Sequence, residues 1–318
     1  MPVSAAAASG NGTYPPRGDW IVGNETHVWN EPIVLRGNLI ITGTGNLTLN
    51  HVTLSMNCAV DGEFHIEVQR GGALYITNNS IITAANPGYS YCFWVNDGAV
   101  FVMKNSELHE CGYKHKDKKK ADLWIDADNT VIENNRVSNN CIGLYLLSSN
   151  NSVLNNTIQS NTAYGIFLSS SKGNIIANNT IIMHNINGIN LESSSNNIIR
   201  ANMIERNTGD GIYLTTSNNN QIIYNMLISN NECGIILEHA CNNNLITDNN
   251  ASNNNLDGIQ LYAHGDHNVL FNNTLIANHE DGIKLLQCDN TTISNNSATY
   301  NDDGLFLAIS RNNRDEEQ

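Results

Sequence analysis

The chain has 318 residues and a mass of 34.9 kDa, which exceeds the usual size of one compact core, yet no proline- or glycine-rich linker divides it. Its formal charge of -14 and pI ≈ 5.0 argue against nucleic-acid binding, because phosphate backbones are bound by clustered Lys and Arg. No run of eighteen apolar residues is present, so the sequence predicts no membrane span.

We expect residues 1–19 to form a flexible N-terminal segment. Their start is small and polar, without the basic and apolar regions of a secretory signal, so any such signal has been removed or was never there. Residues 20–128 predict an N-terminal cover, Trp20 to Trp29, and then long irregular coils. Three segments alternate apolar and polar residues with a period of two, as β-strands do: 33–53, 64–82 and 93–108.

The sequence YKHKDKKKA interrupts this pattern between Gly112 and Asp122. It holds five of the sixteen basic residues, and a charge run of this kind is usually a solvated loop. His109, Cys111 and His115 have a spacing that could suit a metal ion. The neighbouring lysines would repel a cation, so this is the weaker of two metal hypotheses.

Residues 129–310 contain a regular repeat. A glycine followed by Ile or Leu, any residue and then Leu recurs every 22 to 24 residues, at Gly143, Gly165, Gly188, Gly211, Gly234, Gly258, Gly282 and Gly304. Each unit has three short apolar columns, such as Ile166 with Leu168, then Ile176, then Ile181. Three strands per unit predict an all-β, single-stranded parallel β-helix (a β-solenoid) with ~23-residue repeats and about eleven coils, followed by a charged tail at 311–318.

The chain has 56 asparagines, and fifteen of them are predicted to form two columns in these repeats. The first predicted column is Asn135, Asn156, Asn179, Asn202, Asn225, Asn250, Asn273 and Asn296. The second is Asn140, Asn161, Asn207, Asn230, Asn255, Asn278 and Asn301, with His184 where an asparagine would be expected. Stacked amides donate to one neighbour and accept from the other, so we interpret both columns as structural.

The cysteines and the glycosylation motifs are relevant to the cellular location of the protein, but they do not determine it. Seven cysteines are an odd number, so at least one is a thiol, a metal ligand or paired between chains. Eleven Asn-x-Ser/Thr sequons would fit an exported glycoprotein. In a chain this rich in Asn, Ser and Thr, most of them could arise by chance.

The units GIFLSSSKGNIIANN (165–179) and GIYLTTSNNNQIIYN (211–225) resemble those of right-handed parallel β-helix proteins of the NosD-like, CASH-domain type. Those proteins are exported and are named for carbohydrate binding and sugar hydrolysis or for copper-enzyme maturation. The opening segments are similar to archaeal surface proteins of that type. The resemblance implies a right-handed β-helix located extracellularly, at the cell surface or in the periplasm.

Outward side chains of the glycine-led strand predict a ladder along one face. It comprises Tyr145, Phe167, Asn190, Tyr213, Ile236, Gln260, Lys284 and Phe306. Aromatic rings beside carboxylates suit a sugar chain, so the candidate binding residues are Tyr213, Tyr262, Glu192, Glu238, Gln260 and Lys284. The candidate catalytic carboxylates are Asp210, Asp257 and Asp281. The alternative is that each Asp before Gly only caps a tight turn.

The second metal hypothesis concerns three successive coils. Cys241, His264 and Cys288 follow their glycines by seven, six and six residues, with His239 and His267 nearby as further ligands. Stacked sulfur and imidazole could take zinc or copper. The alternative is that these are ordinary loop residues.

Three functions follow from these patterns. The first is a secreted or cell-surface binding or scaffold module that contacts carbohydrate or another cell-surface polymer along one face. The second is a polysaccharide-cleaving enzyme, either a glycoside hydrolase or a lyase. The third is a structural subunit of a surface layer, associating through coil ends or an unpaired Cys, or a metal-binding protein.

Overall fold

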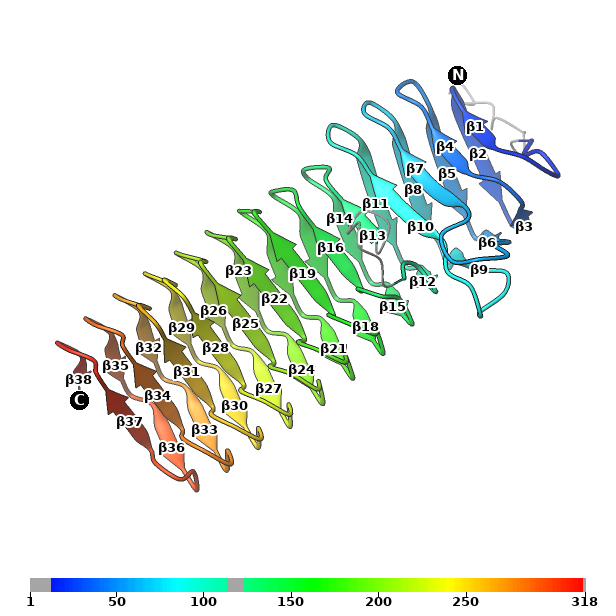
Figure 1. Cartoon of the computed structure of the whole chain (residues 1–318). Coiled ribbons are helices and arrows are strands. Elements are labelled where there is room, and N and C mark those ends of the chain that lie inside the picture. Colours follow the sequence, from blue (N-terminus) through cyan, green and yellow to red (C-terminus); the bar gives the residue numbers. More distant parts are fainter. Residues whose placement is uncertain (1–12, 114–122, 317–318) are drawn as a thin grey trace, which may run out of the picture.

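The computed structural model describes residues 13–113 and 123–316, and Figure 1 shows them as a rod of stacked coils with the two ends of the chain at opposite ends. These residues form strands and turns without a helix. Each coil contributes one strand to each of three parallel sheets, except that the last described coil has no strand in the third sheet. The predicted loop and His115 lie outside the described residues.

The first sheet holds the glycine-led strands. Its thirteen described strands are β1 (Trp20–Val22), β4 (Leu39–Ile41), β7 (His65–Val68), β10 (Cys92–Val95), β13 (Leu123–Ile125), β16 (Leu144–Leu146), β19 (Ile166–Ser169), β22 (Ile189–Glu192), β25 (Ile212–Thr215), β28 (Ile235–Glu238), β31 (Ile259–Tyr262), β34 (Ile283–Leu286) and β37 (Leu305–Ala308).

The second sheet follows in each coil. Its thirteen strands within the described ranges are β2 (Glu25–Trp29), β5 (Asn46–Asn50), β8 (Ala73–Thr77), β11 (Val100–Lys104), β14 (Val131–Glu133), β17 (Ser152–Leu154), β20 (Ile175–Ala177), β23 (Ile198–Arg200), β26 (Gln221–Ile223), β29 (Leu245–Thr247), β32 (Val269–Phe271), β35 (Thr292–Ser294) and β38 (Arg314–Glu316).

The third sheet completes each coil. Counted over the same described residues, its twelve strands are β3 (Pro32–Leu35), β6 (Thr53–Met56), β9 (Ile81–Ala84), β12 (Glu107–His109), β15 (Arg136–Ser138), β18 (Thr157–Gln159), β21 (Thr180–Ile182), β24 (Met203–Glu205), β27 (Met226–Ile228), β30 (Asn250–Ser252), β33 (Thr274–Ile276) and β36 (Ser297–Thr299). The parallel β-helix is thus confirmed, with about twelve turns rather than about eleven.

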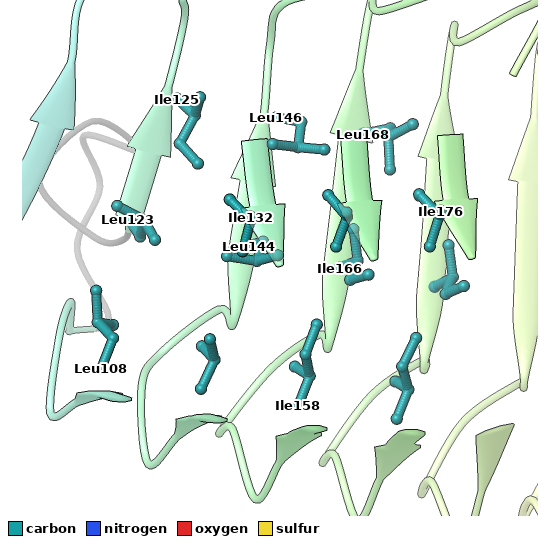
Figure 2. Packing of buried hydrophobic residues seen from close by; sticks show 14 of the residues in the cluster. Leu108, Leu123, Ile125, Ile132, Leu144, Leu146, Ile158, Ile166, Leu168 and Ile176 are labelled. Atoms are coloured by element: carbon teal, nitrogen blue, oxygen red, sulfur yellow. The ribbon is translucent and has the colours of Figure 1, made fainter. Parts of the chain in front are cut away.

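The core is a stack of apolar columns, because alternate residues of every strand point inward. Figure 2 shows Ile158, Ile166, Leu168 and Ile176 among the side chains of the core, and all four are fully buried. The predicted isoleucine column is confirmed by strand register and comprises Ile166, Ile189, Ile212, Ile235, Ile259 and Ile283. The glycines allow this stacking, since a Cβ on Gly211 would lie 2.6 Å from the carbonyl oxygen of Gly234.

Both asparagine columns are present, each with one position corrected. The Nδ2 of Asn156 donates to the Oδ1 of Asn179 at 3.0 Å, and the backbone N–H of Asn156 donates to the same atom at 2.9 Å. Asn249 occupies the place predicted for Asn250, and Asn254 the place predicted for Asn255. In both cases two adjacent asparagines fit the spacing, and the earlier one turns inward.

A third amide ladder, which the sequence did not reveal to us, lies at the turn before the second sheet. Its buried members are Asn151, Asn174, Asn197, Asn220, Asn244 and Asn268. Each asparagine accepts the backbone N–H of the ladder residue in the preceding coil. The ladders therefore satisfy backbone donors that the tight turns would otherwise bury unpaired.

The two ends of the rod differ from the expected cover and tail. Residues 20–29 form β1 and β2 of the first coil, because Trp20 and Val28 point into the core, and Tyr14 packs on Trp20 with ring centroids 5.8 Å apart. Residues 311–318 include β38, which pairs with β35. Leu307, the register partner of buried Leu285, is 47% exposed because no described coil covers it.

Candidate functional site

The outward ladder of the first sheet has the predicted register. Tyr213 pairs with Ile236, Ile236 with Gln260, and Gln260 with Lys284 across β25, β28, β31 and β34. The same register continues from Tyr145 to Phe306. We call the outer surface of β25, β28, β31 and β34, with the turns that lead into them, the acidic face.

The aromatic part of the ladder is packed against itself. Tyr145 and Phe167 are buried with ring centroids 4.9 Å apart, and Trp124 lies 5.0 Å from Tyr145 in an edge-to-face arrangement. Trp124 belongs to the same register, which the irregular spacing of the earlier coils had hidden. These rings stabilise the outer side of the sheet and present little free area to a ligand.

The aspartates before the glycines cap the turns, as the structural interpretation predicts. The Oδ1 of Asp210 accepts the backbone N–H of Cys233 at 2.9 Å, and the Oδ1 of Asp257 accepts that of Asp281 at 2.9 Å. Asp281 in turn accepts the N–H of Asp303. Turn capping uses one oxygen of each carboxylate, so it leaves the second oxygen for another partner.

Asp210 is the most unusual of these carboxylates. It is 5% exposed, and burial raises its pKa to about 7, with the charges of Glu232 and Glu238 adding to the effect. No described residue donates a hydrogen bond to its Oδ2. A buried carboxyl that titrates near neutral pH can either donate or accept a proton there.

Two further contacts join the strands beside Asp210. The hydroxyl of Tyr213 donates to a carboxylate oxygen of Glu238 in the next coil, and burial together with this bond raises the pKa of Tyr213. The Sγ of Cys233 lies 3.6 Å from the Oε1 of Gln260. No described residue accepts from the Nε2 of Gln260, so this amide keeps both its N–H donors.

Lys284 is held by three carboxylates. Its Nζ lies 3.0 Å from Glu280, 3.4 Å from Asp281 and 3.5 Å from Asp257. Burial alone would lower the pKa of Lys284, but the bond to Glu280 and the acidic neighbours outweigh it and the pKa is raised. Burial raises the pKa of Asp257 to about 6 even though Lys284 opposes the shift.

The other predicted binding residues lie along the next row of the same strands. Glu192, at the end of β22, is exposed and pairs in register with Thr215. Tyr262 ends β31, is half-buried and pairs with Glu238, and its ring lies 6.3 Å from that of His239. The first sheet thus brings the predicted binding residues onto one surface.

The residues predicted to bind a metal are not brought together. Cys241 and Cys288 point inward and are fully buried, while His239, His264 and His267 are exposed. Among the described residues, no three His, Cys, Asp or Glu side chains are placed to share a metal ion.

The two cysteines belong to an interior serine row. Cys241 accepts the backbone N–H of Ser217 at 3.4 Å, and Cys288 donates its own N–H to Ser310 at 3.1 Å. Gly265 lies between them in this row, since a Cβ added to Gly265 would lie 3.5 Å from the Sγ of Cys288. His264 is therefore one residue out of register with the two sulfurs. Burial raises the pKa of both thiols to about 11, which disfavours the thiolate that metals bind.

His109 lies in a hydrogen-bonded row on the third sheet. Its Nε2 is 2.9 Å from Glu107 and its Nδ1 is 2.8 Å from the hydroxyl of Ser138. The distances between Glu107, His109 and Ser138 are those expected for a serine nucleophile, its histidine base and the carboxylate that orients the base. Ser138 is only 1% exposed, so a substrate carbonyl has no access to its oxygen.

A polar hollow of about 400 Å³ lies at the turn between the second and third sheets. Its lining residues are Asn79, Asn105, Ser106, Glu107, Asn134, Asn135, Arg136, Asn155 and Thr157. It is open and lies away from the acidic face, so it is an alternative location for a polar ligand.

Two family sequence models match the chain. Residues 115–251 match the right handed beta helix region, and residues 224–315 match the periplasmic copper-binding protein NosD. Among curated proteins, none matches this sequence significantly. The described residues include no helix that is long and apolar enough to cross a membrane.

Solved structures with the same fold include enzymes and a phage protein. A mutant of the periplasmic alginate epimerase AlgG has a TM-score of 0.70 and 17% identity, covering 94% of this chain and 85% of its own. A double mutant of AlgG gives 0.61 and 18%, covering 90% and 77%. The Dettilon tailspike protein gives 0.61 and 14%, covering 89% and 61%. At these identities the likeness shows the fold alone.

Proposed function

Because the chain is a NosD-like right-handed β-helix repeat protein, whose fold alone does not specify a function, we propose that its acidic face binds glycans outside the cytoplasm, extracellularly or in the periplasm. The observation that carries this proposal is a pair of polar atoms on this face, two coils apart, that no described residue hydrogen-bonds. The Oδ2 of Asp210 and the Nε2 of Gln260 have no partner among the described residues.

The hydroxyl groups of a sugar chain match these two atoms, since one hydroxyl can donate to Asp210 and another can accept from Gln260. Tyr213 and Tyr262, both half-buried, add apolar ring area of the kind that packs on pyranose faces. Stacked coils repeat this surface along the rod, so several sugar units of a polymer can be contacted at once. The carbohydrate named for the alginate epimerases of the same fold supports this class of ligand.

A glycan array with the purified protein tests the proposal. Wild-type protein should be retained by at least one glycan, and the double variant Tyr213→Ala with Tyr262→Ala should lose that retention while its melting temperature changes little. Tyr224→Ala is the matched control, because Tyr224 is 64% exposed at a turn remote from the acidic face. Equal retention of the double variant would mean that the face is only a solvated surface.

A second function, glycoside cleavage, is favoured by the carboxyl of Asp210. Its pKa of about 7 is that of a group able to give a proton to a leaving sugar oxygen at neutral pH, with Glu238 or Asp257 as the partner carboxylate. New reducing ends should then appear when the retained glycan is incubated with protein, and Asp210→Asn should abolish them. Retention without new ends identifies a binding module instead.

A further inference from the structure

We propose that two copies of this chain associate as an antiparallel dimer through the outer surface of their second sheets. The second-sheet face is the outer surface of β17, β20, β23, β26, β29, β32 and β35, with the turns that flank these strands. Figure 1 shows β23, β26, β29, β32 and β35 stacked along the rod. This surface is separate from the acidic face, so the inference does not depend on glycan binding.

The first observation is that the second-sheet face is mostly apolar. Its seven strands have fourteen outward residues in two rows of continuous register, and eight of them are apolar: Leu154, Ile175, Ala177, Ile198, Ile223, Leu245, Val269 and Phe271. Phe271 is 39% exposed, and all the others except buried Ala177 are half-buried. A continuous apolar surface on one side of an acidic protein is typical of an interaction site.

The second observation is the arrangement of charge on this face. Lys172 precedes β20 by three residues and Arg200 ends β23, and both side chains are exposed. Asp248 directly follows β29 and Asp266 precedes β32 by three residues, and both are half-buried. Asp289, three residues before β35, adds to the same side. The second-sheet face is therefore cationic on one side of β26 and anionic on the other.

A two-fold axis along β26 matches this arrangement to a second copy. It places β23 opposite β29 of the other copy, and β20 opposite β32, with the two rods antiparallel. Arg200 then faces the end of β29 and the partner's Asp248, and Lys172 faces the partner's Asp266, which holds the same position relative to its own strand. The symmetry repeats each ion pair, which gives four. A parallel dimer would instead place the cationic coils level with the cationic coils of the partner.

The same axis matches the uncharged side chains. Two sheets that pack face to face lie about 10 Å apart, so the outward side chains of both copies meet between them. Ile198 faces the partner's Leu245, and exposed Phe271 faces the partner's Ala177, the smallest apolar residue of the two rows. Exposed Gln221, in β26 at the axis, meets its own copy, and a primary amide both donates and accepts hydrogen bonds. The face is thus complementary to itself, as an isologous interface requires.

The area of the second-sheet face is sufficient for a specific dimer. Seven coils at a spacing of ~4.8 Å give a length of about 34 Å, and a strand with its flanking residues spans about 15 Å. Each copy would bury about 500 Å² and the dimer about 1,000 Å² in total, which is near the lower limit for a specific interface. We therefore expect a dissociation constant on the order of micromolar. The outer surface of the first sheet stays free in this dimer.

Sedimentation of the full chain over a concentration series that reaches about 100 μM tests the dimer. The wild-type mass should rise from 34.9 kDa towards twice that value. Phe271→Asp should weaken the dimer about tenfold or more, because it places a carboxylate in the apolar contact. Met203→Asp on the third sheet is the matched control, since Met203 is 36% exposed, and its dimerisation should equal that of wild type. Melting temperatures check that both variants are folded.

A charge-exchange experiment tests which residues meet. Arg200→Asp and Asp248→Arg, each alone, should weaken the dimer about tenfold or more, because each brings like charges together. An equimolar mixture of the two variants should dimerise again, because every contact then joins an aspartate to an arginine.

Three outcomes would overturn the inference or part of it. A wild-type chain that stays monomeric throughout the concentration series would overturn the dimer. A dimer that Phe271→Asp leaves intact would have to form through another surface. A mixture of Arg200→Asp and Asp248→Arg that dimerises no better than either variant alone would refute the antiparallel arrangement.

Discussion

His184 occupies the ladder position that Asn207 holds in the next coil. The backbone N–H of Asn161 donates to the Nδ1 of His184 at 3.2 Å, and the N–H of His184 donates to the Oδ1 of Asn207 at 3.1 Å. The Nε2 of His184 lies 3.2 Å from the carbonyl oxygen of Ile158. A neutral imidazole with its proton on Nε2 therefore replaces an amide in the interior of the rod.

This replacement makes the fold acid-sensitive. Burial lowers the pKa of His184 to about 4 from 6.5, so between these pH values the unfolded chain binds more protons than the folded one. The stability that the neutral ring contributes is complete above pH 6.5 and is lost as pH falls to about 4. His184→Asn should restore the amide ladder and reduce the loss between pH 7 and pH 5 by about 2 kcal/mol. Urea unfolding at both pH values measures it, and an equal loss in both proteins would contradict it.

Asp210 predicts the opposite pH dependence. Burial raises its folded pKa to about 7 from 3.8, so the stability associated with its protonated form is present at low pH and is lost as pH rises between these values. Asp210→Asn keeps the acceptor for the N–H of Cys233, just as Asn187 accepts the N–H of Asp210 one coil earlier. The variant should melt at a higher temperature than wild type at pH 8 and not at pH 4. A gain of the same size at both pH values would show that the carboxyl is not buried as described.

The isoleucine column predicts a large effect from one polar substitution. Ile212 is fully buried between Ile189 and Ile235, so Ile212→Asn leaves an amide without partners at a cost of about 1 to 3 kcal/mol in addition to the lost packing. Ile212→Val, the conservative control, should cost only about 1 kcal/mol. Thermal melts followed by circular dichroism compare them, and similar melting temperatures for the two variants would argue against a continuous core.

The sulfurs of Cys241 and Cys288 are expected to be structural. Cys241→Ser places a hydroxyl where Ser171, Ser194 and Ser217 already stand in neighbouring coils, so we expect the melting temperature to stay near that of wild type. Incubation with zinc or copper should leave less than about a tenth of an equivalent bound in either protein, because buried thiols of raised pKa are poor ligands. One equivalent in wild type, lost in Cys241→Ser, would re-establish the metal hypothesis.

The coil architecture was accessible from sequence because it repeats. Glycines every 22 to 24 residues, three apolar columns and asparagines at the turns all report the same periodicity, and the register of Ile166 to Ile283 followed from it. The wrong assignments occur where two adjacent residues both fit the repeat spacing. Asn249 and Asn250 both fit the column, and the spacing could not show that Gly265, rather than His264, aligns with Cys241 and Cys288.

The chemistry of the acidic face was harder to predict from the sequence. The ladder could be counted from the glycines, but the burial of Asp210 and the three carboxylates around Lys284 depend on how neighbouring coils pack. The same holds for Tyr145 and Phe167, which were expected on the outward ladder and whose rings pack on each other. The repeat spacing determines whether a side chain points into the core or outward, whereas its exposure depends on the side chains of the adjacent coils.

Carboxyl footprinting with a carbodiimide and an amine, with and without a retained glycan, tests the central claim most directly, because it reports where the ligand lies. Glu238 and Glu280 have side chains 26% and 46% exposed, so both can be labelled in the free protein. We predict that bound glycan protects these two residues and leaves Glu107, at the polar hollow, labelled as before. Protection of Glu107 with unchanged labelling of Glu238 and Glu280 would contradict the account and place the ligand at the turn between the second and third sheets.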